Sequence, residues 1–206
     1  MIRIAVIVGS TRPSRRTEVA ARWVVEVAAR HPAVVDGDVA VELVDLAEFA
    51  LPFLDEPLPA MFGEYRHPHT QRWAETVAGF DGFVFVTPEY NHSMPAALKN
   101  AIDYLYAEWN DKAAGFVSHG VHGGTRAVEH LRLTLAEVKV AGVRSQVALS
   151  VFTDFEIVDP AEPGTIAAGP YQEPALVELF DELIAWSRAL VTVRDAARER
   201  AMAAGV

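Results

Sequence analysis

The residues best suited to chemistry lie near the start of the chain, where an apolar run gives way to a polar loop. Ile2–Val8 is followed by the segment GSTRPSRRT, residues 9–17, and then by an amphipathic stretch. The first N–H groups of a helix have no partner within the helix, and the helix dipole favours negative charge there. Hydroxyl and guanidinium groups add charge-assisted hydrogen bonds. The pattern predicts a phosphate site, although a solvated basic loop remains the alternative for the arginines.

The loop favours a compact terminal phosphate over a longer phosphate chain. It has neither the G-x-G-x-x-G pattern of dinucleotide folds nor the G-x-x-x-x-G-K pattern of nucleotide triphosphatases. A monophosphate fits Ser10, Arg12 and the first amides of the helix better than a pyrophosphate does. The chemistry expected at this point is therefore the binding of a phosphate monoester.

Two further loops carry unusual sequences. Residues 87–95, TPEYNHSMP, lie between two prolines that restrict the backbone, and Tyr90 and Asn91 could contact a planar ring. Ser93 is also expected to cap the helix that opens at Pro95. Residues 118–125, SHGVHGGT, contain three glycines that permit a close approach of the backbone to a flat ligand. A plain glycine-rich turn remains the alternative for this loop.

The elements that must position these loops follow from alternating apolar and amphipathic segments. Buried strands are predicted where apolar runs lack polar alternation, and helices where apolar residues recur at helical spacing. The predicted strands are 2–8, 39–45, 82–87, 113–119 and 145–152. The predicted helices are 17–29, 69–78, 95–106, 125–139 and a final helix from about 173 to 200. Regular alternation of this kind indicates one α/β domain over residues 1–206, a doubly wound parallel sheet with helices on both faces.

The expected strand order is 2-1-3-4-5, with ligands at the carboxyl ends of the strands beside the switch point. The loops after the first, third and fourth strands then meet at one crevice. These are the same three loops whose sequences suggest chemistry, so fold and motifs point to one site.

Composition narrows the function classes. The chain has 206 residues, a formal net charge of −10 and no cysteine. The negative charge argues against general nucleic-acid binding. The absence of cysteine excludes disulfides, thiolate nucleophiles and cysteine-ligated metals. No apolar run reaches the roughly 20 residues of a membrane span, and no signal peptide is recognised. We therefore expect a cytoplasmic protein without membrane association.

These motifs together closely resemble the NADPH-dependent FMN reductase family. The resemblance rests on three segments and covers about residues 2–149: GSTR at 9–12, PEYN at 88–91 running into PAALKNAID at 95–103, and G-x-x-G-G at 120–124. The second segment is long and ordered, which makes it the specific one. The resemblance implies a flavodoxin-like fold, FMN as cofactor, NADPH or NADH as reductant, and a homodimer or dimer of dimers. The acceptor would be a small molecule such as a free flavin, a quinone or an azo compound.

The resemblance also implies roles for individual residues. Ser10 and Arg12 would bind the phosphate. Arg15, Arg16 and Thr17 complete the residues implied around the phosphate. Many relatives carry serine at position 15 and asparagine at position 17: Thr17 keeps a hydroxyl, whereas Arg15 cannot copy a serine contact. The ribityl chain and ring would lie along Pro88, Glu89, Tyr90 and Asn91. The pyrimidine side would be approached by Ser118, Gly120, Gly123 and Gly124. No side chain is expected to act as a catalyst, because flavin would carry the chemistry.

A metal site and a serine nucleophile are the alternatives at the level of the side chains. His119 and His122, or His67 and His69, lack a third ligand at a suitable spacing for a metal, so ring-edge contacts or solvent exposure are expected. No G-x-S-x-G elbow marks Ser10 as a nucleophile. A flavodoxin-like electron carrier reduced by a partner protein is the alternative function, and FMN as an exchangeable substrate is a weaker one.

Two tryptophans and one long loop have expected positions of their own. Trp23 is expected in the core. Trp109 could pack either at a dimer interface or within one subunit. Residues 155–169 could cover the site or extend a dimer contact.

Overall fold

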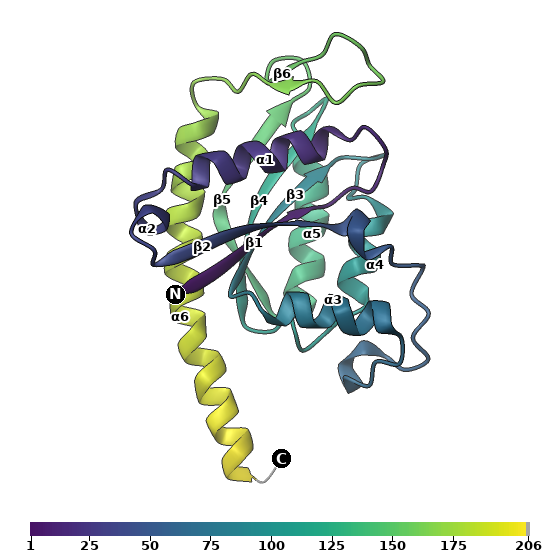
Figure 1. Ribbon diagram of the computed structural model, residues 1–206, viewed down its shortest axis with the longest axis vertical. Helices are drawn as coiled ribbons and strands as arrows, with labels where there is room; N and C mark the ends of the chain where they lie inside the picture. Colours follow the sequence, from purple (N-terminus) through teal and green to yellow (C-terminus); the bar gives the residue numbers. More distant parts are fainter. Residues whose placement is uncertain (205–206) are drawn as a thin grey trace.

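A five-stranded parallel sheet forms the centre of the protein, in a computed structural model that describes residues 1–204. The strands are β1 (Ile2–Val8), β2 (Val39–Asp45), β3 (Gly82–Pro88), β4 (Lys112–Gly120) and β5 (Val140–Ser150). Their order is β2-β1-β3-β4-β5, as predicted (Figure 1). β3 is buried at every position because helices cover both of its faces.

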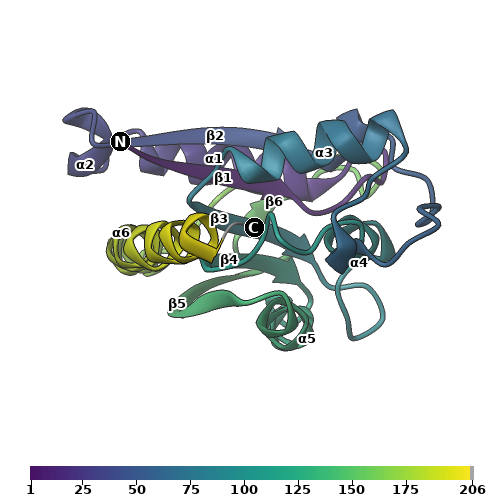
Figure 2. The same cartoon turned by 90° about the horizontal axis from the view of Figure 1, so that it is seen from below.

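Helices cover the two faces of the sheet unequally (Figure 2). Apolar side chains of α1 (Arg16–Ala28) and α6 (Gln172–Ala204) pack on one face. Those of α3 (Pro68–Ala78), α4 (Ala96–Asp103) and α5 (Thr125–Glu137) pack on the other. Shorter elements lie in the connections: α2 (Pro32–Val35), η1 (Leu46–Phe49), η2 (Ala60–Phe62), β6 (Phe155–Glu156) and β7 (Thr165–Ile166).

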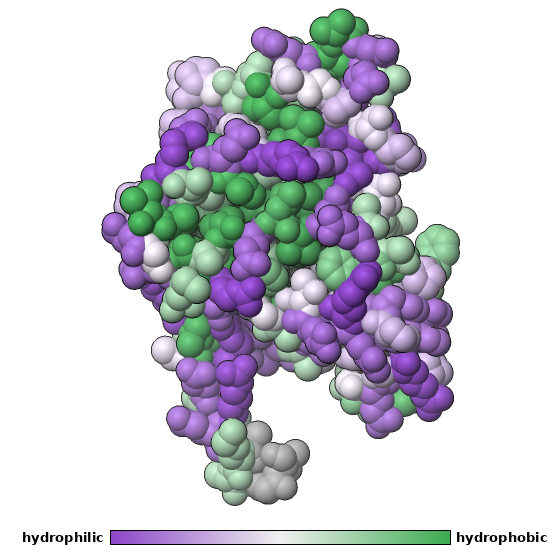
Figure 3. Space-filling view, in the orientation of Figure 1, coloured by the Kyte–Doolittle hydropathy of each residue, from purple (hydrophilic) through white to green (hydrophobic). Residues whose placement is uncertain are grey.

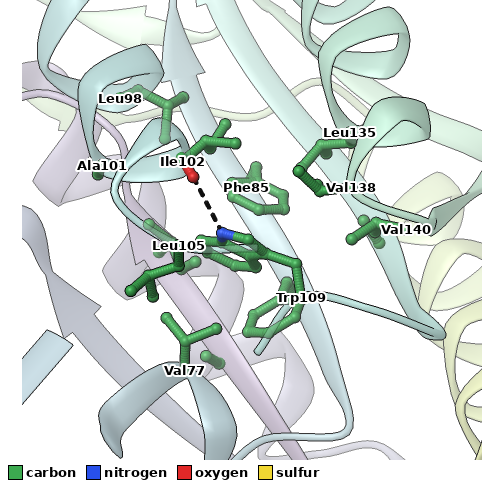
Figure 4. Packing of buried hydrophobic residues seen from close by; sticks show 14 of the residues in the cluster. Val77, Phe85, Leu98, Ala101, Ile102, Leu105, Trp109, Leu135, Val138 and Val140 are labelled. Atoms are coloured by element: carbon green, nitrogen blue, oxygen red, sulfur yellow. Dashed lines mark hydrogen bonds between the residues drawn. The ribbon is translucent and has the colours of Figure 1, made fainter. Parts of the chain in front are cut away.

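Trp109 lies at the centre of the core on the α3–α5 face (Figure 4). Its ring is fully buried and meets the rings of Phe83 and Trp73 edge-on, with centroids 5.0 and 5.9 Å apart. The indole N–H donates to the carbonyl of Ile102 at 3.2 Å, so its polar atom is satisfied. Of the two placements left open for Trp109, packing within one subunit is confirmed.

Several predicted boundaries differ from the structure. β5 begins at Val140 rather than Ser145. The sequence does not reveal this start because Gly142 and Arg144 interrupt the apolar pattern. The pairing of β5 with β4 also changes register between Ala114 and Phe116. The final helix continues to Ala204. Trp23 is only partly buried, packed against the margin of the core.

The surface is divided between apolar and polar regions. Hydrophobic residues gather over the edge strand β2, whereas the part of α6 that extends beyond the body is mostly hydrophilic (Figure 3). Among residues 1–204, no helix combines the length and the apolar character needed to cross a membrane.

Candidate flavin site

A cavity of about 260 Å³ opens at the carboxyl ends of β1, β3 and β4. It is lined by residues of all three loops that the sequence singled out, which meet because parallel strands bring their carboxyl ends to one edge. Eight of its lining residues were predicted from the sequence: Arg12, Arg15, Arg16, Thr17, Pro88, Glu89, Tyr90 and Gly120. The other three are His119, Val121 and Val151.

Ser10 lies under the rim and joins the first two loops. Its side chain is fully buried, and its hydroxyl shares a hydrogen bond of 3.0 Å with the hydroxyl of Tyr90. The backbone N–H of Arg12 also donates to this hydroxyl, at 3.4 Å. Ser10 therefore fixes the path of the loop that leads into α1. The Arg12 side chain is exposed, and none of the ion pairs formed among residues 1–204 involves it.

The N-terminus of α1 faces this cavity without a side-chain cap. Arg15 occupies the N-cap position in an extended conformation, and its side chain accepts no bond from the helix. The guanidinium of Arg15 instead pairs with Asp45 and, at 3.4 Å, with Glu18. The amides of the first turn therefore have no carboxylate or hydroxyl cap, which is the arrangement that favours an anionic ligand.

Arg16 connects the same helix end to the segment before α6. Its guanidinium donates to the carbonyls of Pro160 and Glu162 at 3.3 and 3.1 Å. Part of residues 155–169 therefore lies beside the rim. The Nε atoms of both Arg15 and Arg16 are buried, with no hydrogen-bond partner in the part of the chain that the structure describes. Unpaired guanidinium donors beside an uncapped helix end suit a phosphate group.

The loop after β3 is held by an ion pair between Glu89 and Arg126. The Glu89 carboxylate, almost fully buried, pairs with the Arg126 guanidinium and accepts the Arg126 backbone N–H at 3.3 Å. Burial raises the pKa of Glu89, but the bonds and charge of Arg126 outweigh it, and the net pKa lies below the ordinary value. Glu89 thus remains charged and anchors the loop to the start of α5.

The turn that follows differs from its predicted role. Asn91 and His92 have left-handed backbone conformations, with φ of 49° and 75°. Asn91 is exposed and does not line the cavity. The capping prediction for Ser93 is wrong: α4 has Pro95 at its N-cap without a side-chain bond. The Ser93 hydroxyl bonds Nδ1 of His130 on α5 instead, at 2.9 Å.

The glycine-rich loop after β4 is shaped by its own hydrogen bonds. Gly123 and Gly124 have φ of 69° and 72°, and a Cβ on Gly124 would lie 2.8 Å from the carbonyl oxygen of His119. The buried Ser118 hydroxyl donates to the Gly123 carbonyl at 2.6 Å. These three residues are buried beneath the loop and support the cavity, while Gly120 lines it.

Of the two placements expected for His119, solvent exposure is wrong, and a ring-edge contact stays a prediction. Its side chain is buried and lines the cavity, and its Nε2 shares a hydrogen bond of 2.9 Å with the Thr17 hydroxyl. Burial, with added repulsion from Arg16 and Arg12, lowers the pKa of His119 to about 4. The signal that could have found it is strand alternation, since His119 follows Val117 by two and so faces α1.

The other histidine pair makes ordinary contacts. The rings of His67 and His69 stack with centroids 5.2 Å apart, and His69 Nε2 bonds the Asp55 carboxylate at 3.0 Å. Within residues 1–204 no group of three histidine or acidic side chains is arranged to hold a metal ion.

Comparison with known proteins identifies the family. The sequence pattern described as NADPH-dependent FMN reductase matches residues 2–154. The chain belongs to that family. An NAD(P)H-dependent FMN reductase of Schizosaccharomyces pombe is 41% identical over 164 residues, covering 77% of this chain and 80% of the relative. A 2-hydroxy-1,4-benzoquinone reductase of a Burkholderia species is 31% identical over 138 residues, 64% of this chain and 68% of the relative.

A likeness to solved structures supports the flavodoxin-like fold. The flavoenzyme NAD(P)H:(acceptor) oxidoreductase FerB from Paracoccus denitrificans superposes with a TM-score of 0.67 at 21% identity, covering 92% of this chain and 98% of that one. With the family match, the protein is an FMN-dependent NAD(P)H oxidoreductase, and the predicted fold, activity and cofactors are confirmed.

Proposed function

We propose that FMN binds in the 260 Å³ cavity with its phosphate at the N-terminus of α1. The observation that carries this proposal is the uncapped helix end beside the buried, unpartnered Nε atoms of Arg15 and Arg16. Arg12 supplies a guanidinium that forms no ion pair with the described residues, and Thr17 supplies a hydroxyl. Two carboxylates already pair with the Arg15 guanidinium. We therefore expect Arg15 to bind the phosphate mainly through its backbone N–H and its Nε.

The remainder of the cofactor would extend between the second and third loops. Pro88, Glu89 and Tyr90 line one side of the cavity, and Gly120 lines the other. The two prolines and the Glu89–Arg126 pair keep the second loop in place. Asn91 is exposed at the edge, so its part would be an outer contact.

Bound FMN would supply the chemistry, by accepting a hydride from NAD(P)H and delivering electrons to an acceptor. The chain's own residues bind and orient. The positive charges of Arg12 and Arg16 attract the phosphate, while Val121 and Val151 place apolar surface at the cavity. Nothing in this arrangement requires a nucleophile or a dedicated proton donor among the side chains.

We also propose a quinone as the acceptor class and a cytoplasmic location. The quinone proposal draws on the Burkholderia relative, whose name gives a benzoquinone substrate. A cytoplasmic location agrees with the need for a reduced nicotinamide supply.

A homodimer is the proposed assembly. Phe53, Leu54, Met61 and Phe62 are exposed, between 48% and 85% of their surface. The backbone around Leu54 is fixed to α4: the Leu54 N–H donates to Asn100 at 3.0 Å, and the Asn100 amide donates to the Pro52 carbonyl at 2.7 Å. A second cavity is lined by both Asn100, which holds the segment around Leu54, and Thr11, which belongs to the loop of residues 9–17. A second copy covering the apolar side chains would therefore adjoin the flavin site.

One anaerobic experiment tests the activity. The protein would be loaded with FMN, freed of excess FMN by dialysis, and mixed with NADPH or NADH. Bleaching of the flavin absorbance without an added reductase supports the proposal, and a spectrum unchanged by either nicotinamide contradicts it. Loss of all flavin on dialysis would indicate an exchangeable substrate instead. Turnover with quinones, azo dyes and free flavins then ranks the acceptors.

A further inference from the structure

His119 joins three separate parts of the site. Its backbone carbonyl accepts the Glu89 N–H at 3.0 Å, which holds the loop after β3. Its imidazole bonds Thr17 in the first turn of α1 at 2.9 Å. Its ring also lies beside that of Phe155, with centroids 5.7 Å apart, at the start of the segment before α6. A single residue thus connects elements that the chain brings from far apart.

The imidazole is neutral at ordinary pH. Burial and the charges of Arg16 and Arg12 on the α1 side oppose protonation, and its pKa is about 4. On the β3 side, the carboxylate of Glu89 pairs with Arg126. A neutral imidazole carries one N–H and one acceptor nitrogen. With the proton on Nε2 it donates to Thr17, and the hydroxyl proton of Thr17 is left to donate elsewhere.

Thr17 has a direction in which to donate, because it lines the cavity. The fully buried side chain lies among Arg12, Arg15 and Arg16, where the phosphate is proposed to bind. Within the protein, His119 is the only hydrogen-bond partner of this hydroxyl among the described residues. A buried hydroxyl that serves as acceptor for one group is oriented to donate to another.

We propose that His119 is a positioning residue: its Nε2–H holds the Thr17 hydroxyl so that this hydroxyl donates to the FMN phosphate. The inference rests on the proposed function, since it requires FMN in this cavity. His119 also lines the cavity, but the role proposed for its imidazole is indirect. Its effect is transmitted through Thr17 and is confined to the phosphate end.

The test compares FMN with riboflavin, which lacks the phosphate. Dissociation constants would be measured by fluorescence titration of the full chain and of His119→Leu, His119→Gln, Thr17→Val and the double variant His119→Leu/Thr17→Val. Glutamine can donate from an amide close to the position of Nε2. Thr76→Val is the matched control, because the Thr76 hydroxyl bonds the Arg72 carbonyl on α3, a helix that contributes no residue to the cavity.

We expect His119→Leu to weaken FMN binding by about 5- to 10-fold, the worth of about one hydrogen bond, with riboflavin binding unchanged. Thr17→Val should give a loss of similar size. The double variant should lose no more than either single variant, because both changes remove the same interaction. His119→Gln should recover most of the affinity, and Thr76→Val should match the unchanged chain.

Other outcomes overturn the inference in distinguishable ways. If the unchanged chain binds no FMN, the proposed function itself fails. If it binds FMN but His119→Leu binds equally well, or loses FMN and riboflavin alike, His119 has no role at the phosphate. Should His119→Leu fail to fold, Thr17→Val carries the test alone: unchanged FMN affinity there contradicts the proposal.

Discussion

Glu89 and Arg126 form an ion pair that joins the loop after β3 to the first turn of α5. Glu89 lines the cavity, and Arg126 lies at the start of α5, directly after the glycine-rich loop. The acid is nearly buried and the arginine is partly exposed, so removing one partner leaves the other charge uncompensated in a partly desolvated place.

Removing this carboxylate should destabilise the protein. We expect Glu89→Gln to lower the free energy of unfolding by about 1–2 kcal/mol, because Arg126 and the start of α5 lose an anionic partner. Glu129→Gln, on the exposed face of the same helix, should change it by less than about 0.5 kcal/mol. Because the pKa of Glu89 is lowered in the folded state, its contribution exists above the ordinary glutamate pKa and disappears as pH falls through the lowered value. Urea unfolding at pH 7 and pH 4 measures both effects, and equal losses at the two pH values would contradict the assignment.

The phosphate loop gives a second prediction. Arg12→Ala should weaken FMN binding by about 1.5–3 kcal/mol, the usual worth of a hydrogen bond to a charged group. Arg22→Ala is the control, since Arg22 lies on the exposed face of α1 and pairs with Glu18. Fluorescence titration checks the result. A dissociation constant that Arg12→Ala leaves unchanged removes this residue from the phosphate site.

Lys112 gives a prediction about pH at the opposite end of the sheet. Its buried Nζ donates to the carbonyls of Val77 and Ala78 at the end of α3, and burial, followed by the charge of Arg194, lowers its pKa to about 7. The unfolded chain, with an ordinary lysine pKa, binds more protons between pH 7 and 10. The contribution of Lys112 to stability should therefore grow with rising pH in that range, by up to about 1.4 kcal/mol per pH unit.

The measurement is the difference in unfolding free energy between the unchanged chain and Lys112→Met at pH 6, 7.5 and 9. We expect this difference to shift in favour of the unchanged chain as pH rises. Lys139→Met, which removes a half-exposed lysine paired with Asp111, is the matched control. A constant difference for Lys112→Met would show that this lysine titrates normally.

The glycine loop can be tested with a matched pair of glycines. Gly124 and Gly37 both have positive φ, 72° and 78°, but a Cβ on Gly124 meets the His119 backbone whereas a Cβ on Gly37 meets nothing within 4 Å. Gly37→Ala should cost about 1 kcal/mol of stability from its conformation alone. Gly124→Ala should cost more than about 2 kcal/mol and weaken FMN binding, because the loop must move. Thermal unfolding and titration measure the two effects, and equal costs at both positions would argue against the close contact.

How far the sequence predicted the structure depended on whether the signal was local. The strands at 2–8 and 82–88 could be found because burial on both faces leaves continuous runs of Ile, Val and Phe. The strand order followed from chain alternation, which leaves few topologies. The start of β5 was missed because Gly142 and Arg144 interrupt its pattern, and paired backbone rather than apolar side chains extends that strand.

The motifs predicted where the candidate site lies, but they did not predict the side-chain contacts that depend on tertiary structure. His119 depends on Thr17, and Ser93 depends on His130, both far away in the chain. The spacing between Ser93 and Pro95 suggested a helix cap. It could not show that His130 of α5 lies within hydrogen-bond distance of the Ser93 hydroxyl. The assignment of the predicted residues to FMN remains a prediction that the titrations above address.

The long helix α6 has a practical consequence. Its first half packs on the sheet through residues such as Leu179 and Leu183, while its far end extends away from the body, on the side opposite the loops that line the cavity (Figure 1). A reporter protein or surface tether attached at the far end of this helix would therefore leave the cavity entrance unobstructed, so the molecule can be immobilised on a sensor or an electrode with the cavity facing the solution.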